Sequence, residues 1–263
     1  MDFETVLLDR QAGVLTITLN RPQVLNAMTG RMVEELAEIF RGAGTDKDIR
    51  AVLMTGNGEG FCSGADLANV DSRYEPFKPL GMKQSVELYQ QACFAMLNLE
   101  KPIVGAINGV AAGAGMSMAI ACDIIIASEK ASFTQIFVRR GLVPDCGSFF
   151  LLPRLVGMAR AKELMFTGEA VGAEDALRMG LVNRVVPHDV LMDEARAMAE
   201  KLSQGPTRTI GLIKRILTVS FESNLETTLR EEAMAQGLVI GGQDTIEGVT
   251  AFLEKRPPKF KGE

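Results

Sequence analysis

The chain has 263 residues, 47% of them hydrophobic and 23% charged, which is enough apolar material for a large core and argues against disorder. Its net charge of −5 argues against a nucleic-acid partner, because neutralising phosphates requires a basic surface, and the short Arg139-Arg140 pair is interpreted as a solvated edge. No stretch is long and apolar enough to span a membrane, so no membrane contact is expected. The four cysteines are scattered without a CxxC pair, which predicts neither disulfides nor a metal site and fits a reducing cytoplasm.

Strands and helices alternate along the chain as far as Leu191, which predicts an α/β fold. The expected strands are 6–9 and 14–19 as a β-hairpin, then 49–55, 103–107, 123–127, 131–135 and 181–186. One helix is expected after the N-cap Thr29 and another after Gly115. Further helices are expected over residues 81–98, 146–156, 159–167 and 173–179. Residues 68–79 are expected to form a mobile loop beside the ligand site. Periodicity alone does not distinguish a doubly wound sheet from a spiral of ββα units.

From Leu191 onward the pattern is almost wholly helical, so we expect a boundary near residue 200. Residues 1–200 would form the core with the ligand site, and residues 201–263 would form a helical oligomerisation region. An apolar stripe marks the penultimate helix, and Asp244-Thr245-Ile246-Glu247 predicts a capping box for the last one.

Two glycine-rich turns give the first indication of chemistry. Residues 101–123, KPIVGAINGVAAGAGMSMAIACD, predict a strand, a turn and a helix whose first N–H groups would favour a negative oxygen nearby. Gly113 and Gly115 lack a Cβ, so a ligand could approach the backbone closely, although a tight packing turn would use the same residues. Residues 56–67 form a second such turn. Two N–H groups around one oxygen would stabilise an enolate or a tetrahedral oxyanion.

Three segments of the chain resemble the enoyl-CoA hydratase/isomerase family, the crotonase superfamily: FCSGADL, AINGVAAGAGMSMAIACDIIIAS and GLVPDCGSFFLLPRLVG. NRPQVLNAM near the start and AFLEKRPPKFKG at the end extend the resemblance over nearly the whole chain. The resemblance implies a crotonase-type spiral of ββα units with a C-terminal helical trimerisation region, assembled as a homotrimer or as a hexamer of two trimers. It also implies a substrate carried as a coenzyme A thioester, with no bound cofactor.

The family pattern implies a role for particular residues of this chain. The backbone N–H groups of Ala65 and Ala114 correspond to the oxyanion hole. The CoA would lie against the second glycine-rich turn, the N-terminal segment and the C-terminal tail, which often reaches the CoA of a neighbouring subunit. The implied CoA-binding positions are Leu25, Ala27, Ala65, Asp66, Leu67, Ala68, Phe252 and Lys255, although Lys255 could equally be a solvated surface lysine.

Two departures from the family pattern bear on the reaction. Hydratases of the family hold water between two glutamates, and the matching positions here are Ser117 and Phe137, neither of which can act as a carboxylate base. Ser117 is interpreted as a small residue of the pocket wall. The sole histidine, His188, lies far along the chain and forms no serine–histidine motif that would make Ser117 a nucleophile.

Asp145 remains as the candidate acid. Its place before an expected helix would also suit an N-cap. Isomerases of the family carry a catalytic aspartate at this position, and the 1,2-epoxyphenylacetyl-CoA isomerases resemble this sequence most closely. An apolar environment would raise the pKa of the Asp145 carboxyl.

The resulting hypothesis is an enoyl-CoA isomerase in which Asp145 moves a proton from C2 to C4 of a 3-enoyl thioester. The alternatives are an enoyl-CoA hydratase, a dehalogenase-like enzyme with Asp145 as the nucleophile, and a non-catalytic acyl-CoA-binding oligomer. RNA binding, which one branch of the family shows, is disfavoured by the acidic charge. The acyl group, aliphatic or aromatic, stays open. The expected apolar walls of its pocket are Phe77, Met82, Phe137, Leu142 and Phe149.

Overall fold

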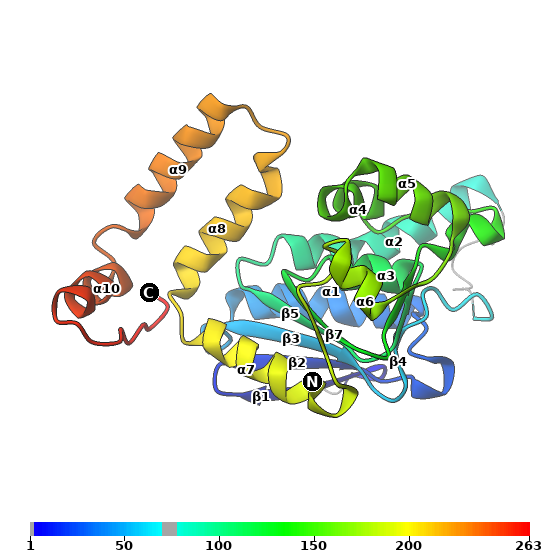
Figure 1. Ribbon diagram of the computed structural model, residues 1–263, viewed down its shortest axis with the longest axis horizontal. Helices are drawn as coiled ribbons and strands as arrows, with labels where there is room; N and C mark the ends of the chain where they lie inside the picture. The colour runs from blue at the N-terminus through cyan, green and yellow to red at the C-terminus, as the bar shows by residue number, and fades with distance from the viewer. Residues whose placement is uncertain (1–2, 70–77) are drawn as a thin grey trace.

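The computed structural model describes residues 3–69 and 78–263, and its strands form two sheets (Figure 1). The larger sheet has the order β1 (Val6–Gln11), β2 (Val14–Leu19), β3 (Ala51–Gly56), β5 (Ile103–Ile107), β7 (Ile124–Ser128) and β10 (Arg184–Val186). The smaller sheet has the order β4 (Gly60–Cys62), β6 (Val110–Ala112), β8 (Ser132–Thr134) and β9 (Val171–Gly172). β1 with β2 and β8 with β9 pair antiparallel, whereas the other neighbours pair parallel.

The chain builds both sheets along a repeated ββα path. β3 enters the larger sheet and β4 the smaller one, and α2 (Pro79–Leu97) follows. β5 and β6 repeat the path before α3 (Ala114–Ile120), and β7 and β8 repeat it before the 3-10 helix η2 (Ile136–Arg140). Successive units therefore pair in parallel within each sheet. The predicted spiral of ββα units is confirmed.

Helices cover both faces of the larger sheet. Helix α1 (Gly30–Thr45) begins where the Thr29 hydroxyl accepts a hydrogen bond from the backbone N–H of Met32 at 3.3 Å, as the predicted N-cap requires. On one face, Met54 of β3 belongs to the apolar core formed with α1 and α2. On the other face, its neighbour Leu53 packs with α7 (Leu191–Ser203), because successive strand residues point to opposite sides.

Short helices complete the body of the molecule. They are η1 (Pro22–Val24), α4 (Ser148–Val156), α5 (Met158–Thr167), α6 (Ala173–Arg178) and η3 (His188–Val190). α5 packs against α4 and η2, and α6 packs against the smaller sheet. Within residues 3–69 and 78–263, no helix has the length and apolar character needed to cross a membrane.

The last three helices extend from one end of the body (Figure 1). They are α8 (Thr207–Ser220), α9 (Leu225–Val239) and α10 (Gln243–Leu253). Arg50, next to the start of β3, ties this region to the sheet, because its guanidinium donates to the Gly205 carbonyl at 2.6 Å and to the Thr207 hydroxyl at 3.0 Å. The division of the chain near residue 200 stays a prediction.

Some local predictions are wrong. The glycine-rich turn after β5 contains the three-residue strand β6. The capping box is absent, because α10 starts after Gly242 and the Asp244 carboxylate instead accepts from the backbone N–H groups of Lys261 and Gly262 at 2.6 and 2.8 Å. The expected mobile loop falls mainly on residues 70–77, which lie outside the described residues, as does Phe77 of the expected pocket wall.

Candidate active site

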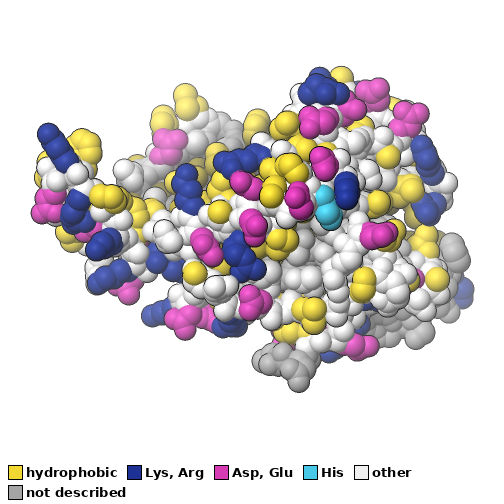
Figure 2. All heavy atoms as spheres, turned by 60° about the horizontal axis from the view of Figure 1, so that its bottom comes forward, with side chains coloured by type: hydrophobic (Ala, Val, Ile, Leu, Met, Phe, Trp, Pro, Cys, Tyr) yellow, Lys and Arg dark blue, Asp and Glu magenta, His cyan; other side chains and the backbone are white. Residues whose placement is uncertain are grey.

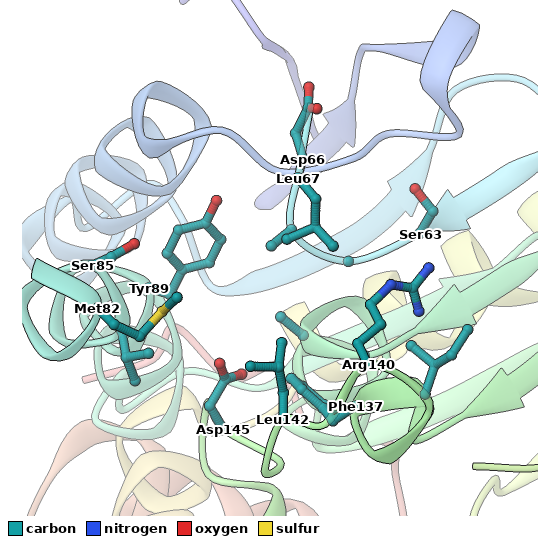
Figure 3. Close-up of a pocket in the computed structure, with 16 residues that line it drawn as sticks. Ser63, Asp66, Leu67, Met82, Ser85, Tyr89, Phe137, Arg140, Leu142 and Asp145 are labelled. Carbon is teal, nitrogen blue, oxygen red and sulfur yellow. The ribbon is translucent and has the colours of Figure 1, made fainter. Parts of the chain in front are cut away.

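A cavity opens between the two glycine-rich turns, helix α2 and the segment from η2 to α4 (Figure 3). It encloses about 920 Å³ of space, part of it open to solvent. Its described lining comprises residues 63–67 and 113–114 of the two turns, Met82, Ser85, Val86 and Tyr89 of α2, and Ile136, Phe137, Arg140, Leu142 and Asp145. The cavity therefore brings together Ala65, Ala114 and Asp145, which the sequence places far apart.

The two amides of the expected oxyanion hole both line this cavity. The backbone after β4 runs beside Met28, whose N–H donates to the Gly64 carbonyl and whose carbonyl accepts from the Asp66 N–H, each at 2.8 Å. This pairing turns the N–H of Ala65 to the other side. Ala114 is the first residue of α3, where an amide has no partner within the helix. Within the described part of the chain, neither amide donates a hydrogen bond.

Two glycines let the turns approach each other. Gly64 has φ +98°, and a Cβ there would lie 2.8 Å from the Ala112 carbonyl oxygen. A Cβ on Gly115 would lie 2.8 Å from the Cys62 carbonyl carbon and closer still to its oxygen. The close approach at Gly115 is therefore that of the β4 backbone and not that of a ligand, which corrects the expectation for this residue. Gly113, with φ +53°, does line the cavity.

Asp145 presents its carboxyl to the cavity from the loop before α4 (Figure 3). The residue that precedes α4 is Gly147, and no side chain caps this helix, so the N-cap interpretation of Asp145 is wrong. Its Oδ1 atom is buried without a hydrogen-bond partner among the described residues. Burial raises the pKa of the Asp145 carboxyl above its ordinary value, and a side-chain hydrogen bond with Cys146 opposes that rise only in part.

The other carboxylate on the cavity is committed to partners of its own. Asp66 lies 2.9 Å from the Arg21 guanidinium and 3.0 Å from the Asn69 side-chain amide. Burial raises the pKa of Asp66, but these hydrogen bonds more than offset it, so the pKa lies below its ordinary value. In Figure 3 the Asp66 carboxylate points away from Asp145. Asp145 is thus the carboxylate of the described lining that is available to a ligand.

The apolar walls agree in part with expectation. Met82, Phe137 and Leu142 line the cavity, whereas Phe149 is 60% exposed and does not. Tyr89 lines it as well, but its hydroxyl is engaged, since it donates to the Met28 carbonyl at 2.8 Å. Phe137 therefore places a hydrocarbon surface at a position where the resemblance would imply a carboxylate in a hydratase.

Ser117 and Arg140 differ from their sequence interpretations. Ser117 is fully buried behind the cavity and is not part of its wall. Arg140 is exposed, as the interpretation as a solvated edge requires, but it also lines the cavity, and Figure 3 shows its guanidinium on the side of Ser63. The spacing could have indicated this, because Arg140 follows Phe137 by three residues on one short helix.

A serine–histidine contact exists elsewhere in the fold. The Ser128 hydroxyl lies 3.0 Å from Nδ1 of His188, the cyan residue of Figure 2, so the sequence interpretation missed this pair. Neither residue lines the cavity. No group of three or more His, Cys, Asp or Glu side chains suited to a metal ion occurs among the described residues.

The expected CoA-binding residues fall into two sets. Ala65, Asp66 and Leu67 line the cavity, and the segment with Leu25 and Ala27 runs beside them, where the Leu25 carbonyl accepts from the Ser63 N–H at 2.9 Å. The N–H of Ala68 already donates to the Asp66 carboxylate at 3.2 Å.

The tail residues Phe252 and Lys255 form the second set. They belong to α10 and the turn after it, at the opposite end of the molecule from α2 and β4 (Figure 1). The tail of this chain does not line its own cavity. The roles of all the expected site residues stay predictions.

Comparisons with known proteins agree with the fold and the cavity. The family model described as enoyl-CoA hydratase/isomerase matches residues 9–263. A 1,2-epoxyphenylacetyl-CoA isomerase of Escherichia coli K12 is 42% identical over 98% of this chain and 99% of its own length. A Rhodobacter capsulatus protein named "Probable enoyl-CoA hydratase" is 39% identical over the full length of both chains. The crystal structure of an enoyl-CoA hydratase from Bacillus anthracis superimposes with a TM-score of 0.92 at 34% identity, covering 99% of this chain and 100% of that one. The chain therefore belongs to the enoyl-CoA hydratase/isomerase family, the crotonase superfamily of acyl-CoA enzymes.

Proposed function

We propose that this enzyme moves a carbon–carbon double bond, converting a 3-enoyl-CoA into the conjugated 2-enoyl-CoA. The observation that carries the proposal is the chemistry of the cavity. Among the residues that the structure describes, its lining has one available carboxylate, Asp145, together with two amides that have no acceptor there, at Ala65 and Ala114. Hydration also needs a second group to activate water, and Phe137 and Ser117 stand where the family's hydratases have glutamates.

The proposed reaction uses Asp145 as both base and acid. The carboxylate takes a proton from C2 of the thioester, and the electron pair of that C–H bond is delocalised so that C2, C4 and the thioester carbonyl oxygen share the negative charge. The N–H groups of Ala65 and Ala114 stabilise the negative oxygen. Protonated Asp145 then returns the proton to C4, which leaves the double bond between C2 and C3. No water is added and no bond to sulfur is broken.

The environment of Asp145 suits this double role. A raised pKa brings the acid and base forms of the carboxyl closer in free energy at neutral pH, so one group can take and return a proton. The name of the Escherichia coli relative, a 1,2-epoxyphenylacetyl-CoA isomerase, favours an isomerisation over the addition of water. The name of the Rhodobacter capsulatus relative favours hydration, which stays the second candidate.

A paired assay tests the proposal. The purified protein receives a 3-enoyl-CoA in one reaction and a 2-enoyl-CoA in another, and the products are identified by mass and chromatography. We expect the first substrate to become the conjugated isomer and neither product to gain the mass of a water molecule. Addition of water to the 2-enoyl-CoA would contradict the proposal and support the hydratase. Binding of both thioesters without turnover would support a non-catalytic acyl-CoA-binding oligomer.

Asp145→Asn supplies the matching variant. It should still bind the thioester and should lose at least about 100-fold in kcat, the size typical of removing a general acid–base group. Asp193→Asn, at an exposed carboxylate on α7, is the control and should keep full activity. With a 3-enoyl-CoA deuterated at C2, part of the label should appear at C4 of the product, because one buried carboxyl carries the proton.

Assembly and location also stay proposals. We infer that the chain assembles with copies of itself, because apolar side chains of the C-terminal helices are exposed in the single chain. The number of subunits, three or six as a homotrimer or a hexamer of two trimers, is what the family resemblance implies. A cytoplasmic location fits the four free, buried cysteines, but one relative, from Dictyostelium discoideum, is named as mitochondrial.

A further inference from the structure

Behind the cavity wall, three fully buried polar side chains form a hydrogen-bonded chain that ends on the backbone of Asp145. The Gln135 side-chain amide donates to the Ser148 hydroxyl at 3.1 Å. The Ser148 and Ser117 hydroxyl oxygens are 2.6 Å apart. The Ser117 hydroxyl donates to the Asp145 carbonyl oxygen at 3.1 Å. None of these three side chains lines the cavity.

The donors and acceptors fix the direction of this series of hydrogen bonds. Ser148 accepts from the amide of Gln135, so its single proton is free to point to the Ser117 oxygen. Ser117 then has its own proton left for a carbonyl, either that of Asp145 or that of Gly113 one helical turn earlier, at 3.2 Å. Each hydroxyl both donates and accepts, and such chains strengthen their members cooperatively in a low-dielectric interior.

Ser117 joins the two halves of the site. It lies on α3, three residues after Ala114, whose N–H belongs to the proposed oxyanion hole. Its hydroxyl bonds the residue that carries the proposed acid–base carboxyl. We propose that Ser117 is a positioning residue, which holds Asp145 at a fixed place relative to the Ala114 amide. The inference rests on the proposed function and deepens it.

A purely structural role explains the cluster less well. The Oε1 atom of Gln135 is buried and accepts no hydrogen bond within the described part of the chain. An unsatisfied buried acceptor costs stability, so a core selected for stability alone would favour an apolar side chain here. Proton transfer between C2 and C4 does need a fixed carboxyl, because a misplacement of about 1 Å at a reacting group lowers rates by about 100-fold.

The test compares Ser117→Ala with Ser203→Ala. Ser203 is also a buried serine, and its hydroxyl donates to the Ala12 carbonyl at 2.9 Å, but it lies on α7, away from the cavity. Both variants should lose similar stability. Only Ser117→Ala should lose activity, with kcat falling about 10- to 100-fold and KM changing less than about threefold. Ser117→Thr, which keeps the hydroxyl, should recover part of the lost kcat.

Three outcomes would overturn the proposal. One is an unchanged kcat in Ser117→Ala, and another is an equal loss of kcat in both alanine variants. The third is a crystal structure of Ser117→Ala in which Asp145 is unchanged from the wild type. We expect instead that its carboxyl is displaced or less ordered relative to the Ala114 N–H. An unchanged Asp145 would overturn the positioning role even if the wild type isomerises no thioester, so this measurement separates the inference from the proposed function.

Discussion

Asp145 combines a buried carboxyl with an oxygen that lacks a hydrogen-bond partner among the described residues, so its ionised form is unfavourable in the folded chain. Its pKa is raised on folding, so the stability that this group contributes is fully present below its unfolded pKa and is lost as the pH rises through the folded pKa. We therefore expect Asp145→Asn to be inactive yet more stable than the wild type at neutral pH, by about 1–3 kcal/mol. Urea unfolding at several pH values measures this difference, which should shrink toward acid pH. A less stable variant at neutral pH would contradict the argument.

Asp66 lines the same cavity, but its pKa shifts in the opposite direction. Its pKa is lowered by Asn69 and Arg21 despite burial, so its contribution to stability is present above the unfolded pKa and is lost as the pH falls through the folded pKa. Asp66→Asn should therefore lower the free energy of unfolding at neutral pH, by about 1 kcal/mol. The same urea series measures both variants. If Asp66→Asn and Asp145→Asn changed the free energy of unfolding equally, the environments of the two carboxyls would not differ in the way that their contacts indicate.

Arg140 places a positive charge on an otherwise mostly apolar cavity, and it has no acidic partner among the described residues. A CoA thioester carries negative phosphate groups, which the Arg140 guanidinium would attract. Arg140→Gln should therefore raise the dissociation constant of the thioester about three- to tenfold and reduce the salt dependence of its binding. Arg139→Gln is the matched control, because Arg139 is adjacent, lies off the cavity and donates to the Thr167 carbonyl at 3.5 Å. Calorimetric titration at two salt concentrations measures both. Equal affinities of the two variants for the thioester would show that Arg140 does not contribute to its binding.

At the scale of the elements, the meeting of β4 and α3 depends on Gly115. Replacing a helical glycine by alanine normally stabilises a helix by about 0.5–1 kcal/mol. At Gly115 the added methyl group would overlap the Cys62 backbone, so Gly115→Ala should instead destabilise the chain by about 1–3 kcal/mol and separate the two turns of the oxyanion hole. Gly42→Ala on α1 is the control, since a Cβ there meets nothing within 4 Å. Thermal unfolding of the two variants should shift in opposite directions.

The elements that the sequence predicted well are those set by local chemistry. The Thr29 cap, the hairpin of β1 and β2 and the buried strand β5 follow from residue type and spacing. The features that it missed depend on distant partners. The spacing around Asp244 predicts a cap, but the partner of this carboxylate, the backbone N–H of Lys261, lies 17 residues further along the chain. Ser117 acquires its distant partners only when α4 and the loop before it pack against α3, and Arg140 reaches the cavity only when η2 lies beside the glycine-rich turns. The site positions themselves came from the family resemblance, since spacing alone left Asp145 as either an acid or a helix cap.

On the scale of the whole molecule, the body and the C-terminal helices differ in how they bury apolar surface. The body has two cores, one on each face of the larger sheet. Helix α9 buries none of its residues, and it leaves Leu225, Leu229, Met234 and Leu238 exposed. Figure 2 shows hydrophobic side chains on the surface of this end of the molecule. A helix that keeps a whole apolar stripe in water gains little from packing, so we infer that another surface covers this stripe.

We expect that surface to be other copies of this chain. Light scattering after size exclusion should give a mass three or six times the 28.4 kDa of one chain. Leu229→Lys should lower the mass, because a charge would lose its hydration at the contact. Leu7→Lys is the control, since Leu7 on β1 is 50% exposed against 53% for Leu229 but lies outside the C-terminal helices. A wild-type mass of 28.4 kDa, or equal disruption by both variants, would contradict the assembly.

A smaller Leu229→Lys species should also bind CoA thioesters more weakly if Phe252 and Lys255 act on a neighbouring cavity, because neither residue lines the cavity of its own chain.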